Sequence, residues 1–496
     1  MSLDNTFPSV HTRATSGLAP GGLGRGLFAS TSTIHTGEDV LHVTSPFVAV
    51  LETDRLEDTC SGCFGKGLLR HCALLKGCSG CKVVKYCNTT CQKADWKFAH
   101  AQECSIFQSL RPRILPINAR ALLRIVVRCA RQKYAAEELD LFSRLETHVR
   151  EIRDQNPAQW ERIVLTSKAV KTYSGTDLTE ELISAFGARL ELNSFNFTTA
   201  IYDRIGLYFH PYAALVNHDC DYNAIVGFDG EELFIKAIRP IQPGEQIFIS
   251  YIDTTNPVKL RRKELHERYY FNCQCSKCKH DLSNPQNTPP TTQAQDLSAE
   301  EAAEQKAFAI LDKIPESSLD LSAGVEVLQS TMQSLRQTYS LPITRQPLVS
   351  LRDGLIVVLQ ATQNTDFVFI QCAIRYLRVD PIVYKTDLHP IRQLHAYMLA
   401  KAAVEFQHGM KESLGLWSVE LGEPMLIAWS IANRLVETED QACTVPGFQR
   451  MVRWFLGAVN EHYKGVKKGP KKREDDIRRE WERLELMVDM AIKDGY

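Results

Sequence analysis

Cysteine placement is the feature of this sequence with the most chemical content. Eleven of its fifteen cysteines lie in two clusters, between residues 60 and 104 and between residues 273 and 278. Cys-x2-Cys pairs in a chain without a secretion signal favour metal binding over a disulfide framework. The first cluster offers four ligand pairs: Cys60/Cys63, Cys78/Cys81, Cys87/Cys91 and His100/Cys104. Because zinc takes four thiolate or imidazole ligands in a tetrahedron, these eight residues predict two zinc ions.

The segment that carries these pairs is too small to fold on a hydrophobic core alone. Zinc binding, at about 10–16 kcal/mol for each structural ion, would supply the difference. His71 and Cys72 have no partner at pair spacing, so we expect them to be spectators. Seven Lys or Arg and two Asp or Glu lie between residues 60 and 104. We interpret this basic surface as a solvated face that balances thiolate charge, with contact to nucleic acid or an acidic partner as the alternative.

The second cluster, Cys273, Cys275 and Cys278, is one ligand short of a tetrahedron. Cys220, in the stretch "NHDCDYNAI", has no neighbouring cysteine and would supply the fourth thiolate. A third zinc ion would then bring the loop after Asn217 and His218 against the segment "YYFNCQC". We therefore expect one cavity surrounded by Asn217, His218, Tyr269 and Phe271. The alternative, a small buried Cys220, leaves the three thiolates without a fourth ligand.

Short strands are predicted to position these groups. "DVLHV" and "PFVAVL" read as strands near the start of the chain, and residues 205–252 as an antiparallel unit with turns at Asp229-Gly230 and Pro243-Gly244. The preceding "GGLGRGLFAS" does not fit a phosphate loop, because it lacks the Lys-Ser/Thr ending and a following helix. Its glycines indicate a turn where backbone can approach a ligand closely.

Helices are predicted for most of the remainder. From residue 105 to about 190 the pattern is helical, and "NARALLRIVVRCARQ" places Arg120, Arg124, Arg128 and Arg131 on one face. We expect this face to be solvated or paired with acids, with a substrate-attracting face as the alternative. Residues 281–297 are a polar, proline-rich linker, and residues 298–496 read as paired helices of a degenerate tetratricopeptide-like (TPR-like) array. The fold class is therefore α+β with an all-α C-terminal domain.

Bulk composition excludes some classes of function. A chain of 496 residues should hold more than one domain, and its formal net charge of -1 gives no overall bias toward nucleic acid or membrane. With no secretion signal and no long apolar run, we expect an intracellular protein of the nucleus and cytoplasm that binds no membrane. "KGVKKGPKKR" at 464–473 is either a nuclear signal or a solvated loop.

Two family resemblances follow from these motifs. The pattern of ligand pairs, with Tyr86 and Trp96, resembles the MYND zinc finger, and this resemblance implies interleaved sites. One site would use Cys60, Cys63, Cys87 and Cys91, and the other Cys78, Cys81, His100 and Cys104. The ordered set "GRGL", "NSF", "NHDC", "GEQIFISYID" and the cysteine trio resembles, over about residues 20–280, the SET and MYND domain (SMYD) family of protein-lysine methyltransferases. The implied domains are an N-terminal SET part (1–59), MYND (60–104), a helical insert (105–192), the SET core (193–252), a zinc-binding post-SET segment (253–280), the linker (281–297) and the helical domain (298–496).

The second resemblance implies a reaction and its residues. The reaction is methyl transfer from S-adenosylmethionine to the ε-amine of a lysine in a histone or other protein. Cofactor contacts are implied for Gly24, Arg25, Gly26, Asn193, Asn217, His218, Tyr251 and Phe271. Catalytic positions are implied for Tyr251 and Tyr269, which would line the lysine channel. The blander interpretations, a core strand tyrosine and a core histidine, are outweighed by the end-of-strand position of Tyr251 and by the neighbours of His218.

One departure and one alternative remain. Asp219 stands where the family usually has a small hydroxyl residue, and Asp221-Tyr222-Asn223 where it usually has Asp-Pro-Asn, which puts cofactor binding strength in doubt. The alternative function is a non-catalytic adaptor that recruits protein, proline-rich peptide or DNA partners through the MYND and helical domains. Zinc hydrolase chemistry is disfavoured, because each predicted zinc ion already has four ligands. We expect a monomer.

Overall fold

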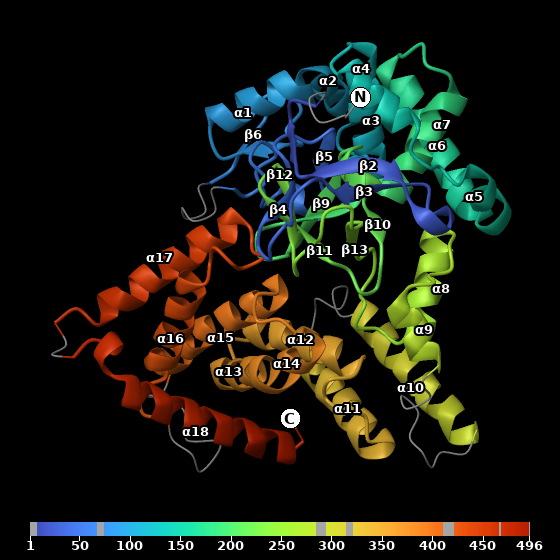
Figure 1. The fold of residues 1–496 in the computed structure, drawn as a ribbon. Helices are drawn as coiled ribbons and strands as arrows, with labels where there is room; N and C mark the ends of the chain where they lie inside the picture. The colour runs from blue at the N-terminus through green and yellow to red at the C-terminus, as the bar shows by residue number, and fades with distance from the viewer. Residues whose placement is uncertain are drawn as a thin grey trace. The chain divides into compact units, whose positions relative to one another are not determined.

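The computed structural model describes residues 7–66, 74–283, 294–313, 321–409, 421–465 and 468–495 (Figure 1). The chain divides into two units. The N-terminal unit comprises Met1–Tyr251, Lys263–Cys273 and Val445–Phe448, and the C-terminal unit comprises Ile252–Arg262, Gln274–Thr444 and Gln449–Tyr496. His71 and Cys72 lie outside the described residues. Among the helices that are described, none is long and apolar enough to cross a bilayer.

Short strands pair into small sheets in the N-terminal unit. In order of pairing these are β1 (Val10–Thr12), β4 (Asp39–Val43), β12 (Glu232–Ala237) and β11 (Ala224–Asp229); β2 (Ala14–Leu18) and β3 (Arg25–Ala29); β5 (Val48–Leu51), β9 (Arg204–Phe209) and β8 (Phe195–Thr198); β6 (Lys76–Gly77) and β7 (Lys85–Tyr86); and β10 (Asn217–His218) and β13 (Phe248–Ile249). The predicted antiparallel character holds for all these pairs except β10 and β13, which run parallel.

The predicted hairpin is present, with its turn one residue later than the Asp229-Gly230 dipeptide. Asp229 pairs with Glu232, so the two loop residues are Gly230 and Glu231. Gly230 has φ +61°, and a Cβ there would lie 2.8 Å from the carbonyl oxygen of Cys63. The glycine therefore serves both the turn and the close approach of the first cysteine cluster.

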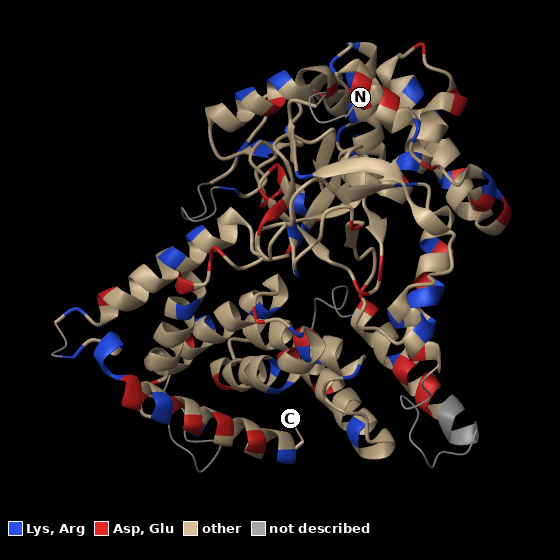
Figure 2. Cartoon of the chain, viewed as in Figure 1, with Lys and Arg blue, Asp and Glu red and all other residues tan. Residues whose placement is uncertain are grey.

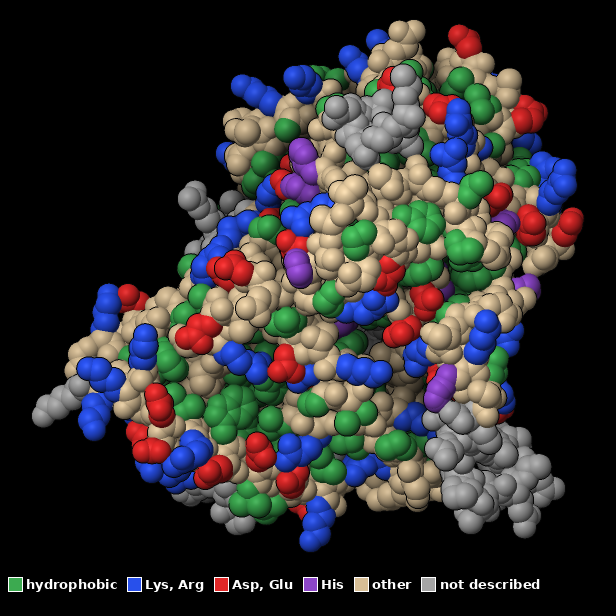
Figure 3. Space-filling view, in the orientation of Figure 1, with side chains coloured by type: hydrophobic (Ala, Val, Ile, Leu, Met, Phe, Trp, Pro, Cys, Tyr) green, Lys and Arg blue, Asp and Glu red, His purple; other side chains and the backbone are tan. Residues whose placement is uncertain are grey.

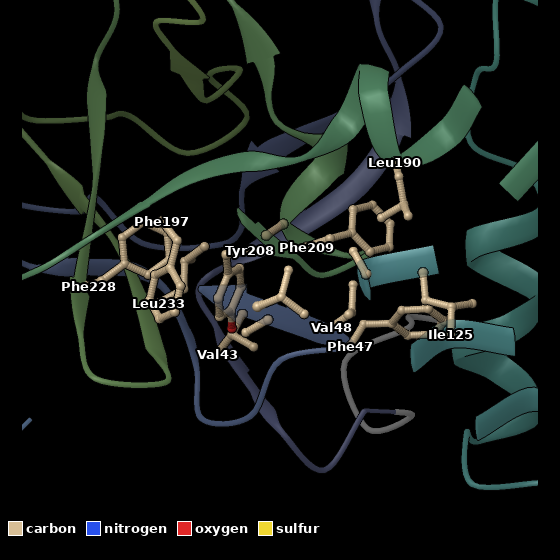
Figure 4. Close-up of a cluster of buried hydrophobic side chains, with 14 of the residues drawn as sticks. Val43, Phe47, Val48, Ile125, Leu190, Phe197, Tyr208, Phe209, Phe228 and Leu233 are labelled. Atoms are coloured by element: carbon tan, nitrogen blue, oxygen red, sulfur yellow. The ribbon is translucent and has the colours of Figure 1, made fainter. Parts of the chain in front are cut away.

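One hydrophobic core joins the sheets of this unit to the helices around them (Figure 4). Phe47, immediately before β5, stacks on Tyr134 with ring centroids 3.9 Å apart and meets Phe209 of β9 edge-on. Phe197, Tyr208 and Phe228 form a second aromatic group in the same core. Because both groups are buried and closely packed, they fix the positions of the strands that carry them.

Helices of the N-terminal unit surround this core. They are α1 (Thr89–Asp95), α2 (Ala101–Leu110), α3 (Ile117–Ala130), α4 (Ala136–Ser143), α5 (Val149–Gln155), α6 (Pro157–Ser174) and α7 (Glu180–Asn193). Arg120, Arg124 and Arg128 of α3 are buried and only Arg131 is exposed, so a solvated stripe was the wrong interpretation. The acid-paired alternative holds for Arg124, which contacts Glu103 and Asp95.

The described part of the C-terminal unit is helical. Its helices are α9 (Ser276–Ser283), α10 (Ala294–Lys313), α11 (Leu321–Tyr339), α12 (Leu348–Ala361), α13 (Thr365–Ile374), α14 (Asp380–Val383), α15 (Pro390–Gly409), α16 (Pro424–Glu437), α17 (Pro446–His462) and α18 (Glu474–Lys493), while α8 (Val258–Tyr269) and α17 each contribute to both units. Residues at both ends of the expected linker belong to α9 and α10. Acidic and basic side chains follow one another along α18 (Figure 2), whereas its Leu484, Val488 and Ala491 are buried. The TPR-like character of these helices stays a prediction.

Candidate active site and metal centres

The first eight ligands form two groups of four. The first set is Cys60, Cys63, Cys87 and Cys91, and the second set is Cys78, Cys81, His100 and Cys104; within each set the donor atoms all lie within 4.8 Å of one another. Four Zn–S bonds of about 2.3 Å at tetrahedral angles place two sulfurs about 3.8 Å apart. The Sγ atoms of Cys63 and Cys87 are 3.8 Å apart, and those of Cys78 and Cys104 are 3.7 Å apart. Both sets therefore fit zinc, and they interleave along the chain.

Local structure presents these ligands. Asn88 caps α1 by accepting the amide of Cys91 at 2.9 Å, which fixes Cys91 one turn beyond Cys87. α1 continues through a π-type turn into α2, so His100 and Cys104 lie four residues apart on one helical face. A Cβ at Gly80 would lie 2.8 Å from the sulfur of Cys104, so this position requires glycine. The Asn88 cap and the close approach of Gly80 to Cys104 therefore help to place the ligands of the two sets.

A buried charge network stands behind the second set. The Nδ1 atom of His100 lies 3.8 Å from a carboxylate oxygen of Glu103, and Arg124 of α3 grips that carboxylate with two hydrogen bonds of 2.7 Å. Although burial by itself raises the pKa of Glu103, the Arg124 guanidinium lowers it to about 2. Arg124 also donates to the carbonyl of Ala49 in β5 at 3.0 Å. The second set is therefore tied to the core of the N-terminal unit.

The third set is Cys220, Cys273, Cys275 and Cys278, whose sulfurs also lie within 4.8 Å of one another. The structure thus brings the isolated Cys220 to the distant trio. The amide of Cys278 donates to the sulfur of Cys275 at 3.3 Å, which stabilises a thiolate in this tight turn. Four thiolates at this separation fit a structural zinc ion that has no open position.

A cavity of about 670 Å³ lies in the N-terminal unit. Of the nine residues predicted for cofactor or catalysis, the following eight line it: Gly24, Arg25, Asn193, Asn217, His218, Tyr251, Tyr269 and Phe271. Gly26 lies immediately beside it, since a Cβ there would be 2.9 Å from the side-chain nitrogen of Asn217. Residues spread over nearly 250 positions therefore share one enclosure of a size typical for a small-molecule site.

Asn217 connects the N-terminal glycine segment of this cavity to strand β10. Its side-chain nitrogen donates to the carbonyl of Arg25 at 3.1 Å, which holds the "GRG" segment against β10. Gly24 has φ +71° in the turn before β3. Asn193, at the end of α7, donates to the carbonyl of Glu146 at 3.1 Å and orders the loop before α5. These amides shape the walls of the cavity through backbone contacts.

Aromatic rings form another wall. The rings of Tyr251 and Tyr269 lie 4.9 Å apart between centroids, and His218 lies 5.3 Å from Tyr251 and 6.1 Å from Phe271. The hydroxyl of Tyr251 donates to the carbonyl of Val216 at 2.7 Å. Burial, with a smaller contribution from Tyr269, raises the pKa of Tyr251, so its phenol is neutral and acts as a donor.

Comparison with known proteins gives a match to one domain and similarity to several proteins. Residues 24–252 match the model of the SET domain. The chain is 32% identical over 210 residues to histone-lysine N-methyltransferase SMYD3 of Mus musculus, covering 41% of this chain and 49% of that protein. It is 30% identical over 259 residues to SET domain and MYND-type zinc finger protein 6 of Schizosaccharomyces pombe, covering 52% and 50%. The chain therefore contains a SET domain and is similar to proteins of the SET and MYND domain family.

Coverage of the family relatives is partial. N-lysine methyltransferase SMYD2 of Homo sapiens is 30% identical over 263 residues, which cover 52% of this chain and 58% of that protein. The chain thus spans about half the length of the curated relatives it matches. The SET match contains the cavity-lining residues from Gly24 to Tyr251, whereas Tyr269 and Phe271 lie beyond it.

Several residues that line the SET cavity were not predicted from the sequence. Glu146 and His148 come from the loop before α5, Phe195 comes from β8, and Tyr202 comes from the turn before β9. His148 and Tyr202 have φ of +43° and +63°, which is uncommon for residues other than glycine. A sequence pattern does not show positive φ at His or Tyr, so no available signal could have found these two.

Asp219, the departure from the family pattern, has a local role. Its carboxylate accepts the amide of Asp221 at 2.7 Å and closes the turn that carries Cys220. Its own amide donates to the carbonyl of Ile249. Asp219 is not among the cavity-lining residues of the described chain, so the doubt it raised about cofactor binding finds no support in direct contact.

Proposed function

We propose that this chain is an S-adenosylmethionine-dependent protein-lysine N-methyltransferase. The observation that carries the proposal is a single cavity that contains both the cofactor residues of the SET pattern and the Tyr251–Tyr269 pair. The names of the matched relatives, a histone-lysine and an N-lysine methyltransferase, support the same reaction. Because the matches cover about half of each relative, the activity and the protein substrate are proposals for this chain.

The cavity residues suit a molecule with adenosine and amino-acid ends. Phe271 and the buried edge of His218 offer an aromatic surface on which adenine would pack. The Gly24–Gly26 segment offers backbone groups without side-chain obstruction, and Arg25 adds a cation for a carboxylate. S-adenosylmethionine bound there would supply a methyl group on a sulfonium. The residues hold and orient that donor and exclude water.

The Tyr251–Tyr269 wall suits a lysine amine. A free lysine has a pKa of about 10.4, so a neutral amine at pH 7 costs about 4.6 kcal/mol. An aromatic, poorly hydrated channel disfavours the ammonium form by desolvation and reduces that cost. The Tyr251 hydroxyl donates its hydrogen bond to the carbonyl of Val216, so the lone pairs of the phenol oxygen can accept an N–H of the amine. This acceptor would turn the amine lone pair toward the methyl group, and such alignment supplies much of the acceleration.

The adaptor alternative has one observation in its favour. Lys76, Lys82, Lys93 and Lys97 of the MYND segment are exposed, and Trp96, which precedes Lys97 in the sequence, is 45% exposed. An exposed indole among cations suits a proline-rich peptide or a nucleic acid. On the face shown in Figure 3, however, basic and acidic groups are interspersed. Partner binding at MYND, a monomeric state and a nuclear and cytoplasmic location are therefore proposed as additions to catalysis.

Calorimetric titration of the zinc-loaded chain with S-adenosylmethionine tests the proposal, followed by mass spectrometry of a lysine-containing peptide array. We expect saturable binding and a gain of one or more methyl groups on particular lysines. Saturable binding without methylated peptides on histone and non-histone arrays would favour the adaptor. Absence of binding by a sample that holds three zinc ions would overturn the enzymatic function.

A further inference from the structure

Both ring nitrogens of His218 have partners in the N-terminal unit. The imidazole is buried, with 6% exposure. Its Nδ1 atom lies 3.1 Å from the backbone nitrogen of Tyr251, and its Nε2 atom lies 3.4 Å from the sulfur of Cys220. The ring thus stands between a ligand of the third set and the tyrosine of the reaction centre.

These partners decide where the imidazole proton lies. A backbone N–H only donates, so Nδ1 must be the unprotonated acceptor of the Tyr251 amide. The proton of the ring therefore lies on Nε2, and Nε2–H donates to the sulfur of Cys220. A thiolate sulfur bound to zinc is a natural acceptor for this bond.

The same argument shows that His218 is not a metal ligand. A zinc-bound Nε2 would need its lone pair, which would place the proton on Nδ1 and set two donors face to face at Tyr251. Cys220 already completes a group of four with the downstream cysteines, and His218 is not part of that group in the described structure. His218 therefore acts next to the metal and not on it.

Tyr251 is clamped by the segment that carries His218. Its phenol donates to the carbonyl of Val216, and its amide donates to His218, two residues further along the chain. The parallel pairing of Asn217 and His218 with Phe248 and Ile249 sets the register of this clamp. Displacing the His218 ring would move the Tyr251 backbone while its hydroxyl stayed attached to Val216.

We propose that His218 is a positioning residue whose imidazole, fixed as the Nε2–H tautomer, transmits the geometry of the third zinc set to Tyr251. The expected effect on kcat rests on the proposed methyltransferase function, whereas the tautomer and the contacts of His218 do not. The side chain of His218 holds the acceptor for the substrate amine in place, and its contribution to cofactor binding is secondary. Zinc held by the third set would fix Cys220, and His218 would pass that constraint to the backbone of Tyr251 through its two hydrogen bonds.

Two substitutions separate the two contacts. In His218→Gln the amide nitrogen takes the place of Nε2 and can donate to Cys220, but no acceptor remains for the Tyr251 amide. In His218→Asn the amide oxygen takes the place of Nδ1 and can accept from Tyr251, but the donor to Cys220 is lost. We expect kcat to fall by about tenfold or more in His218→Gln and by less in His218→Asn. The affinity for S-adenosylmethionine should fall to a similar extent in both, because both substitutions remove the ring beside Phe271, so the difference in kcat between the two variants reports the contact with Tyr251.

Two readouts do not depend on activity. With 15N-labelled histidine, the His218 resonances, identified by their loss in His218→Gln, should show a protonated Nε2 and an unprotonated Nδ1. In protein loaded with 113Cd, His218→Asn should shift the resonance of one four-thiolate site and leave the second set unchanged. A zinc content of three per chain and an unchanged unfolding midpoint serve as the folding control.

Three results would overturn the proposal. The first is an Nδ1–H tautomer in the native protein. The second is a loss of cofactor affinity that accounts for the whole kinetic effect of both substitutions. The third is an unaltered cadmium spectrum in His218→Asn. If the chain binds no S-adenosylmethionine at all, the proposed function fails, while the tautomer and the cadmium shift still decide the role of His218.

Discussion

The phenol of Tyr251 shows how single atoms define the candidate site. Its oxygen lies 2.7 Å from the carbonyl of Val216, and its ring faces Tyr269. Because the phenol donates its hydrogen bond to that carbonyl, the oxygen presents only lone pairs to a substrate amine. Tyr251→Phe removes this acceptor without changing the ring. We expect kcat to fall on the order of 10²-fold, with cofactor affinity unchanged within about twofold, as measured by methyl transfer to peptide and by calorimetry.

A matched control exists in the same core. Tyr208 is fully buried and its hydroxyl has no hydrogen-bond partner in the described structure. Tyr208→Phe therefore removes an equivalent hydroxyl that binds nothing, and it should be neutral or slightly stabilising with normal kcat. Equal losses of kcat in the two variants would show that the Tyr251 effect is structural and not chemical.

The pH dependence of the reaction follows from the same phenol. Burial, with a contribution from Tyr269, raises the pKa of Tyr251 above its ordinary value near 10. The sign is set by desolvation, which penalises the charged phenolate and keeps the neutral form present at higher pH. Substrate lysine, by contrast, becomes more reactive as it loses its proton. We expect log(kcat/KM) to rise with a slope near one between pH 7 and 9.5, without a descending limb. A bell-shaped profile with its maximum below pH 9 would contradict the assignment.

Helix α3 illustrates what an element contributes. Arg124 holds Glu103, whose neighbours His100 and Cys104 belong to the second zinc set, and it also meets Asp95. Arg124→Met leaves the buried Glu103 carboxylate without its guanidinium partner and without the two hydrogen bonds that the guanidinium donates. We expect a loss of about 3–5 kcal/mol in the free energy of unfolding, measured by urea denaturation. Arg131→Met, on the same face but exposed, should change it by less than about 0.5 kcal/mol.

Helix α3 also shows which features can be predicted from the sequence and which cannot. The period of α3 was readable, but the acids that pair with Arg124 precede it by 21 and 29 residues, and periodicity does not reveal such partners. Zinc ligands were predictable because coordination fixes residue type, number and spacing. The β11–β12 hairpin was predictable because its turn needs glycine at positive φ.

The parallel pair of β10 and β13 was not predictable from local pattern. Each strand has two residues, which is too short for an alternation signal. Their pairing depends on the loop that carries Cys220 and on the aromatic wall behind it. The clamp on Tyr251 belongs to this same class of feature, because it joins backbone groups and a ring nitrogen over 35 residues.

At the scale of the whole molecule, the N-terminal unit needs residues from late in the chain. Val445–Phe448 belong to this unit, and Val445 and Phe448 are buried. A Cβ at Gly447 would lie 2.8 Å from a carboxylate oxygen of Asp229 and 3.0 Å from the Cβ of Ala200. We expect Gly447→Ala to lower the free energy of unfolding by about 1 kcal/mol, measured by chemical denaturation.

The opposite effect on the free energy of unfolding is expected for a second glycine of the same helix. Gly457 also lies in α17, and nothing would stand within 4 Å of a Cβ there. Gly457→Ala should therefore raise the free energy of unfolding by about 0.5–1 kcal/mol through helix propensity. Destabilisation by both substitutions would mean that α17 itself, and not its contact with the β11–β12 hairpin, sets the effect.

The three sets of zinc ligands differ in how well they are shielded from solvent. All four ligands of the second set are buried, whereas three of four in the first set are partly exposed. Since a chelator must reach the ligands, the first set should release zinc before the second, and the second should release it only with unfolding. Release followed with a chromophoric chelator should show separate phases, with Cys87→Ser abolishing the fast phase and Cys81→Ser the slow one. Simultaneous release of all three ions would mean that the sets unfold as one cooperative unit, because the network from His100 through Arg124 to Ala49 would then extend to the first set as well.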